Sequence, residues 1–128
     1  MAEFFDALKV FEDDLKGKVD IPVENSSIPT DSVSMRVALN NADADGLFTN
    51  SSARVMTGQF AIKISAPLGM NKYTMMANAG KILEHYKRGV SFNVEGSRMV
   101  ILQVNQSTPY PADKVQEINV IIDFQFSA

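Results

Sequence analysis

The chain contains no cysteine and no tryptophan, and its only histidine is His85. Without cysteine there are no disulfides, thiolate metal sites or thiol nucleophiles, as is usual in reducing compartments. His85 lies near the expected end of a helix, where the helix dipole favours cationic residues without any catalytic role. Glycine-rich phosphate loops, the GxSxG turn and zinc-ligand spacings are missing as well. We therefore expect no enzyme activity, no cofactor and no metal site.

Long apolar runs are also missing, since no segment approaches the roughly 20 consecutive apolar residues that span a bilayer. The first 18 residues are acidic where a signal peptide would be basic, which predicts a cytosolic protein without a membrane partner. Residues 1–31 hold eight acidic and three basic residues, and the remaining bases are scattered among acids. Phosphate recognition needs a clustered basic face, so specific nucleic-acid binding is not expected.

The 128 residues, 45% of them apolar, suffice for one globular domain spanning residues 1–128. The first helix is indicated by apolar residues at positions i, i+4, i+7 and i+11, with Gly17 expected to end it. The members of this stripe are Phe4, Leu8, Phe11 and Leu15. An extended segment from Val19 to Pro22 follows.

Strand patterns alternate apolar and polar residues. The first such pattern covers Val33 to Leu39, and its expected partner ends at Ser65 and carries Phe60, Ile62 and Ile64 on one face. Pro67 and Gly69 end that strand, and a helix with Asn71 as its N-cap then continues towards Gly89. Its core-facing residues recur at helical spacing: Met75, Ala79, Ile82 and Tyr86.

Two further strands are expected near the C-terminus. Val100, Leu102 and Val104 alternate in one, and the other presents Ile118, Val120, Ile122, Phe124 and Phe126 on a single face. The opposite face of this final strand is mostly polar, which is typical of an edge strand that adds to a neighbouring sheet. Glu117 and Asp123 lie on that polar face and are expected to be solvated.

These elements predict an α+β fold, with an antiparallel or mixed sheet of four to five strands and two helices packed on it. The order of elements resembles that of the tail terminator proteins of long-tailed bacteriophages. The resemblance implies a homo-oligomeric ring, hexameric in that family, which caps the head-proximal end of the tail tube, stops tube polymerisation and provides the head–tail joining surface. Its implied partners are further copies of the chain, the tail-tube protein and a head-completion or connector protein, in the host cytoplasm during assembly and afterwards in the virion tail.

The polar stretch at residues 40–52 is too long for a tight hairpin and invites a functional interpretation. It contains Leu47 and Phe48, which either dock into a partner or fold back onto their own core. We expect this loop, together with Arg54 and Lys63, to contact partners. Part of the loop matches a calcium-binding pattern, but Ser52 stands where that pattern requires a bidentate carboxylate.

Two alternatives remain open at this point. Another head–tail connector or a tail-tube subunit would share the assembly character. A small ligand-binding domain would instead need a concave site with convergent polar groups.

Overall fold

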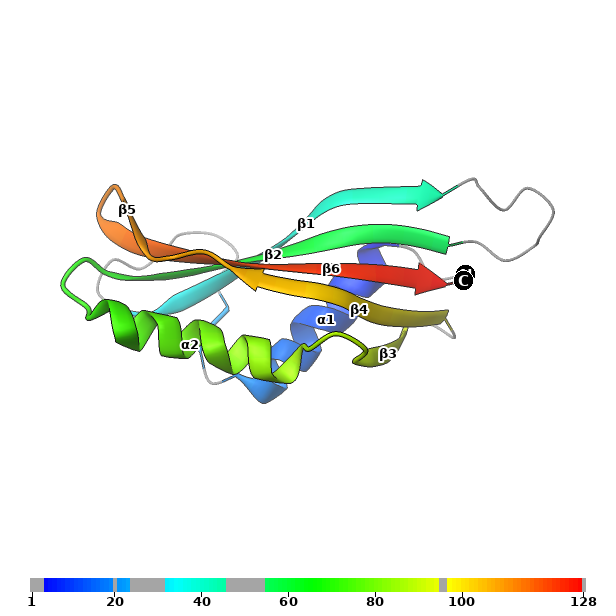
Figure 1. Cartoon of the computed structure of the whole chain (residues 1–128), viewed down its shortest axis with the longest axis horizontal. Helices are drawn as coiled ribbons and strands as arrows, with labels where there is room; N and C mark the ends of the chain where they lie inside the picture. Colours follow the sequence, from blue (N-terminus) through cyan, green and yellow to red (C-terminus); the bar gives the residue numbers. More distant parts are fainter. Residues whose placement is uncertain (1–3, 20, 24–31, 46–54, 95–96, 128) are drawn as a thin grey trace.

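The computed structural model shows a six-stranded sheet with both helices on one face (Figure 1). The structure describes residues 4–19, 21–23, 32–45, 55–94 and 97–127. The elements in chain order are α1 (Phe4–Lys18), β1 (Ser34–Asp45), β2 (Val55–Pro67), α2 (Lys72–His85), β3 (Ser91–Val94), β4 (Ser97–Gln106), β5 (Tyr110–Ala112) and β6 (Val115–Ser127). The predicted α+β class with two helices on an antiparallel sheet is confirmed, with six strands in place of four or five.

The strands lie in the order β1-β2-β6-β4-β3, and β5 pairs with β6 next to β4. All of these strands pair antiparallel. The prediction that the final strand is an edge strand is wrong, because β6 pairs with β2 along one side and with β4 and β5 along the other. Its mostly polar second face arises because the helices cover only one face of the sheet, and antiparallel sheets commonly leave the other face to water.

The first strand is longer than its apolar pattern. β1 continues through residues 40–45, which were predicted as the start of a loop, and its register with β2 shifts between Asn40 and Asp43. Backbone pairing does not need apolar side chains, and a bulge allows the alternation to change within one strand. At its beginning, the Met35 amide donates a 2.8 Å hydrogen bond to the Pro22 carbonyl, which places the predicted extended segment beside β1.

The alternation predicted for β4 is wrong in its first half. Met99 and Ile101 are fully buried, whereas Leu102 is 39% exposed. A register shift between Ile101 and Gln103 resets the alternation, so Val104 packs against the core as expected. A one-residue irregularity of this kind moves every later side chain to the other face.

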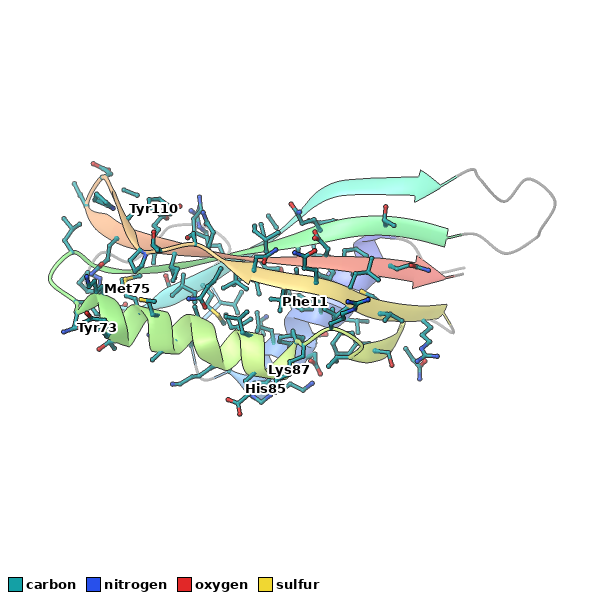
Figure 2. All side chains as sticks on the ribbon, viewed as in Figure 1. Phe11, Tyr73, Met75, His85, Lys87 and Tyr110 are labelled. Atoms are coloured by element: carbon teal, nitrogen blue, oxygen red, sulfur yellow. The ribbon has the colours of Figure 1, made fainter. Side chains whose placement is uncertain are left out.

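An aromatic stack lies at the centre of the core, between the sheet and the helices. The Phe11 ring of α1 stacks on Phe60 of β2 at 4.3 Å between ring centroids, and Phe60 stacks on Phe124 of β6 at 4.4 Å. Tyr86, directly after α2, tilts against Phe11 at 4.9 Å. Offset aromatic pairs contribute about 0.5–1.5 kcal/mol each beyond their burial. Figure 2 shows Phe11 between α1 and the sheet.

Most of the remaining helix predictions are confirmed, except that α1 continues one residue past Gly17, to Lys18, and Leu8 is only partly buried. Asn71 caps α2, since its side-chain oxygen accepts a hydrogen bond of 2.8 Å from the Tyr73 amide. Its four predicted core residues are fully buried, as are Phe11 and Leu15 of α1. Gly89, beyond the end of α2, has φ +94°, a left-handed conformation that glycine adopts without a Cβ clash. The side chains of Phe4 and Phe126 lie outside the described residues.

Tyr86 also joins α2 to α1 through its hydroxyl, which donates a 2.7 Å hydrogen bond to Asp14 Oδ2. Asp14 pairs with Lys18 at 3.0 Å, and the Lys18 ammonium lies over the Tyr86 ring. Burial raises the pKa of the Tyr86 phenol above its ordinary value, and the hydrogen bond to the Asp14 carboxylate and its negative charge raise it further.

Gly58 leaves room for the aromatic stack. It lies opposite Phe124 in the β2–β6 register, and a Cβ atom there would be 2.6 Å from Phe124 Cζ. The Phe124 ring is held by Phe60, so moving it aside would cost free energy.

We expect Gly58→Ala to lower the free energy of unfolding by about 1–3 kcal/mol, measured by urea unfolding. The control is Gly80→Ala in α2, where the new Cβ has no heavy atom within 4 Å beyond its chain neighbours and its own helix backbone. It should stabilise by about 0.5–1 kcal/mol, and equal losses at both sites would contradict this explanation.

Tyr86→Phe removes the bond to Asp14 and should cost about 1.5 kcal/mol at neutral pH, the low end for a charged acceptor, because Asp14 keeps Lys18. The raised pKa means that the folded state holds the phenol proton more tightly than the unfolded state. The stabilisation by the Tyr86–Asp14 hydrogen bond is complete below about pH 10 and is lost as the pH rises further. The stability difference between the two proteins should therefore shrink above pH 10 in urea titrations. Tyr73→Phe, at a side chain that is 68% exposed, should show neither effect.

Candidate functional site

The structure describes one of the four predicted contact residues. Leu47, Phe48 and Arg54 lie outside the described residues, so their roles stay predictions. Lys63 lies on β2, on the sheet face opposite both helices, with 39% of its side chain exposed. We call this side the open face of the sheet. His85 and Lys87, near the end of α2, are exposed, and Figure 2 shows them far from Tyr110.

A charged cluster surrounds Lys63 on the open face. Arg36 of β1 lies directly opposite Lys63, and Glu117 of β6 lies next to them, in register with Ser65. Glu117 is only 6% exposed, so the prediction that it is solvated is wrong. The long side chains of Arg36 and Lys63 can cover the carboxylate with their stems while their charged ends reach water. Arg36, Lys63, Ser65 and Glu117 form what we call the Glu117 cluster.

The contacts within this cluster are of two kinds. The Ser65 hydroxyl donates a hydrogen bond of 3.1 Å to Glu117 Oε2. The two cations are more distant, with Arg36 Nη2 at 3.7 Å from Oε2 and Lys63 Nζ at 3.9 Å from Oε1. These separations permit electrostatic attraction but exceed ordinary N–H···O hydrogen-bond lengths. Glu117 therefore balances the charge of the cations without occupying their donors.

Among the described residues, one buried polar atom of the cluster and one beside it lack hydrogen-bond partners. Arg36 Nε and the hydroxyl of Ser34 are buried, and neither makes a hydrogen bond in the described part of the chain. Ser34 precedes Arg36 by two residues on the same face of β1 and lies opposite Ser65. An unsatisfied buried donor costs about 1–3 kcal/mol, so this part of the open face is not optimised for stability.

The carboxylate of Asp123 has different surroundings from that of Glu117. It is half-buried and accepts a hydrogen bond of 2.8 Å from Gln59 Nε2 on the neighbouring strand. A shallow surface groove of about 310 Å³ opens beside this pair, at the exposed Leu102. The expectation of a simply solvated carboxylate is therefore wrong here as well, although this pair brings no second titratable group to the groove.

An apolar patch lies at one end of the molecule, where β2 turns into α2. Leu68 and Tyr73 are 53% and 68% exposed. A shallow groove of about 280 Å³ beside them is lined by Leu68, Lys72, Pro109, Tyr110, Pro111 and Gln116. Figure 2 shows Tyr73 and Tyr110 at this same end. We call Leu68, Tyr73 and the Pro109–Pro111 segment the tip patch.

The backbone beneath the tip patch is held by Gln116. Its Nε2 atom lies 2.9 Å from the Pro67 carbonyl oxygen, 2.6 Å from that of Met70 and 3.3 Å from that of Leu68. The central strand β6 thus fixes the turn that exposes Leu68. A turn held in this way presents its apolar side chain with little further loss of conformational entropy on binding.

In the described ranges, no three His, Asp or Glu side chains gather in a way that could hold a metal ion. Nor does either helix have the length and apolar character needed to cross a membrane, within the same residues. The Glu117 cluster and the tip patch are both suited to contact with another molecule.

Sequence reasoning missed most of these residues, for identifiable reasons. The partnership of Arg36 with Glu117 depends on β1 and β6 lying on either side of β2, which no local pattern reveals. The sequence weakly indicates that Tyr73 is exposed, since it lies off the apolar stripe of its helix. Leu68 lies between Pro67 and Gly69, and this local pattern indicates only a turn.

Comparison with known proteins gives a likeness of fold. No protein-family model matches the chain, and no curated protein matches it in sequence. One solved structure, of a protein whose name states no function, is similar to this chain with a TM-score of 0.67. The similarity covers 97% of this chain and 95% of that chain at 12% sequence identity. At this identity the likeness shows a shared fold and nothing about activity.

Proposed function

We propose that this protein is a structural subunit of a long-tailed bacteriophage. In this proposal it forms a ring on the head-proximal end of the tail tube, stops tube growth and offers a joining surface to the head. The order of elements that resembles the tail terminators motivates the proposal. The observation that carries it in the structure is a sheet with two unlike edges, which suits head-to-tail contact between copies.

The two edges are β1 and β3, at opposite ends of the strand order. In the described residues, the outer side of β1 pairs only through the Val23–Met35 bridge, and no strand pairs with the outer side of β3. An unpaired edge accepts another strand through its free backbone groups. Contact between two different edges is heterologous, and it produces a ring when the rotation between copies closes.

A terminator also needs a surface that differs from its ring contacts, because it must bind the tube once and then stop. The tip patch supplies a candidate surface. It is apolar and contains two tyrosines, and its Leu68 lies on a turn fixed by Gln116, properties that favour a binding hot spot. A tail-tube subunit remains the second candidate function, since it would use similar edges and would differ in its polymerisation.

Light scattering and negative-stain electron microscopy test the proposal on the purified protein, alone and mixed with tail-tube subunits. We expect discrete rings or short capped tubes. Long tubes formed by this chain alone would reassign it as a tube subunit. A monomer that remains indifferent to tube subunits would remove the assembly role altogether.

The edge contact can be tested with one lysine. Ala38 is exposed on β1, and a lysine on an edge strand opposes pairing with another chain. Ala38→Lys should reduce the oligomeric fraction at least ten-fold in light scattering, with an unchanged melting temperature. Ala77→Lys makes the same change on an exposed position of α2 and should leave oligomers intact. Rings that survive Ala38→Lys would rule out β1 as the contact.

The tip patch can be tested separately from the ring. Leu68→Ser combined with Tyr73→Ser removes exposed apolar area and should weaken binding to tail-tube subunits by at least ten-fold, with rings retained. Binding is measured by co-sedimentation with preformed tubes. His85→Ser combined with Lys87→Ser changes two exposed side chains near the other end of α2. If both double variants bind alike, the tip patch does not contact the tube.

A further inference from the structure

We propose that the Glu117 cluster is a binding site for a carboxylate side chain from an acidic segment of a protein partner. The bound carboxylate would accept hydrogen bonds from Arg36 and Lys63. The inference goes beyond the tail-capping proposal and does not depend on it, because it concerns one face of a single subunit.

The donors of the site are present and unused. Arg36 and Lys63 each have 39% of their side chains exposed, so an incoming group can reach them. Neither side chain makes a hydrogen bond in the described part of the chain, and Glu117 stays 3.7–3.9 Å away. The orientation of Glu117 is fixed instead by Ser65. The carboxylate of a partner could therefore bind without displacing any contact within the protein.

The charge of the cluster selects the ligand. Arg36 and Lys63 lie directly opposite each other on adjacent strands, where two like charges repel. Glu117 neutralises one of the two positive charges, which leaves a net charge of +1. A single carboxylate completes this balance, and the planar guanidinium of arginine is well matched to carboxylate geometry. A phosphate dianion would exceed the available charge and would be repelled by Glu117.

The surroundings on the open face also disfavour a polyanion. The row of side chains beyond Arg36 and Lys63 is apolar and contains Ala38, Ala61 and Ile121. The next row contains the acidic Asp123 paired with Gln59. Nucleic-acid binding needs several neighbouring cations to replace condensed counterions. One cationic spot beside an apolar strip instead suits a peptide with an acidic residue and an apolar neighbour.

The test is a titration of the full chain with acetyl-tetraglutamate amide, followed by backbone amide chemical shifts. We expect shifts centred on Arg36, Lys63 and Glu117 that weaken as salt is added. Arg36→Gln and Lys63→Gln should each weaken binding at least five-fold. Lys81→Gln removes an exposed lysine from α2 and should change the affinity by less than two-fold.

Glu117→Gln gives the sharpest test, since it raises the net charge of the site from +1 to +2. A glutamine can still accept the hydrogen bond from Ser65, and the variant should bind the peptide at least three-fold more tightly. A mere structural role for Glu117 predicts the opposite, namely a lower melting temperature and weaker binding. Thermal unfolding is measured alongside, and affinity is compared below the onset of unfolding.

Two further ligands decide between carboxylate and phosphate. Inorganic phosphate and a short oligothymidylate are titrated under the same conditions. Tighter binding of either one than of the peptide at this cluster would overturn the proposal and point to a phosphate or nucleic-acid site. Absence of peptide-induced shifts around Arg36 and Lys63 at low salt would also overturn it. Because no ring or tube enters this experiment, its failure is distinct from failure of the tail-capping proposal.

Discussion

The stacking of Phe11 on Phe60 and of Phe60 on Phe124 is the contact on which the rest of this fold depends. It joins α1, β2 and β6, and Tyr86 extends it to the end of α2. Because the rings are large and nearly parallel, their positions leave little freedom to the backbones that carry them. Gly58 is one result, since only a residue without a Cβ fits opposite Phe124. The placement of α1 across the sheet, in contact with both β1 and β3, is another.

The concentration of the core on one face of the sheet has consequences for the opposite face. With both helices on one face, the open face is free to carry polar groups whose positions are set by strand register. Arg36, Lys63 and Glu117 come together in this way from three strands that are distant in sequence but adjacent in space. Their backbone positions are fixed by the core beneath them, and the hydrogen bond from Ser65 orients the carboxylate of Glu117. Rigid strands hold such a group more precisely than a loop would.

The sequence predicted well wherever one face of an element is buried along its whole length. The alternation of Phe60, Ile62 and Ile64 and the helical spacing of Met75, Ala79 and Ile82 correspond to fully buried side chains. The prediction failed where a bulge interrupts the period, as after Ile101 in β4, and where pairing continues through polar residues, as in β1. The strand order was also beyond local patterns. The polar face of β6 suggested an edge, although the same composition arises in a central strand with helices on one side only.

The candidate sites were less predictable than the fold, because each one combines residues from distant elements. Lys63 was identified, but its partners Arg36 and Glu117 follow from a three-strand register that depends on the whole topology. The tip patch similarly joins the turn after β2 to the segment around Tyr110, which lies more than 35 positions later in the chain. Pro67 and Gly69 flank Leu68, and Pro109 and Pro111 flank Tyr110, and such residues are typical of turns. Only the folded arrangement shows that these turns lie beside each other.

The central position of β6 has a consequence for synthesis on the ribosome. β6 is translated after every other strand of the sheet, yet β2 and β4 can be joined only through it. Before residues 115–127 emerge, the nascent chain has the β1–β2 and β3–β4 pairs and two helices, and isolated two-stranded pairs are marginally stable at best in water. The aromatic stack is likewise incomplete until Phe124 has been added. The sheet therefore closes only after β6 has been made, and β1 and β3 become the two edges of one sheet at that point.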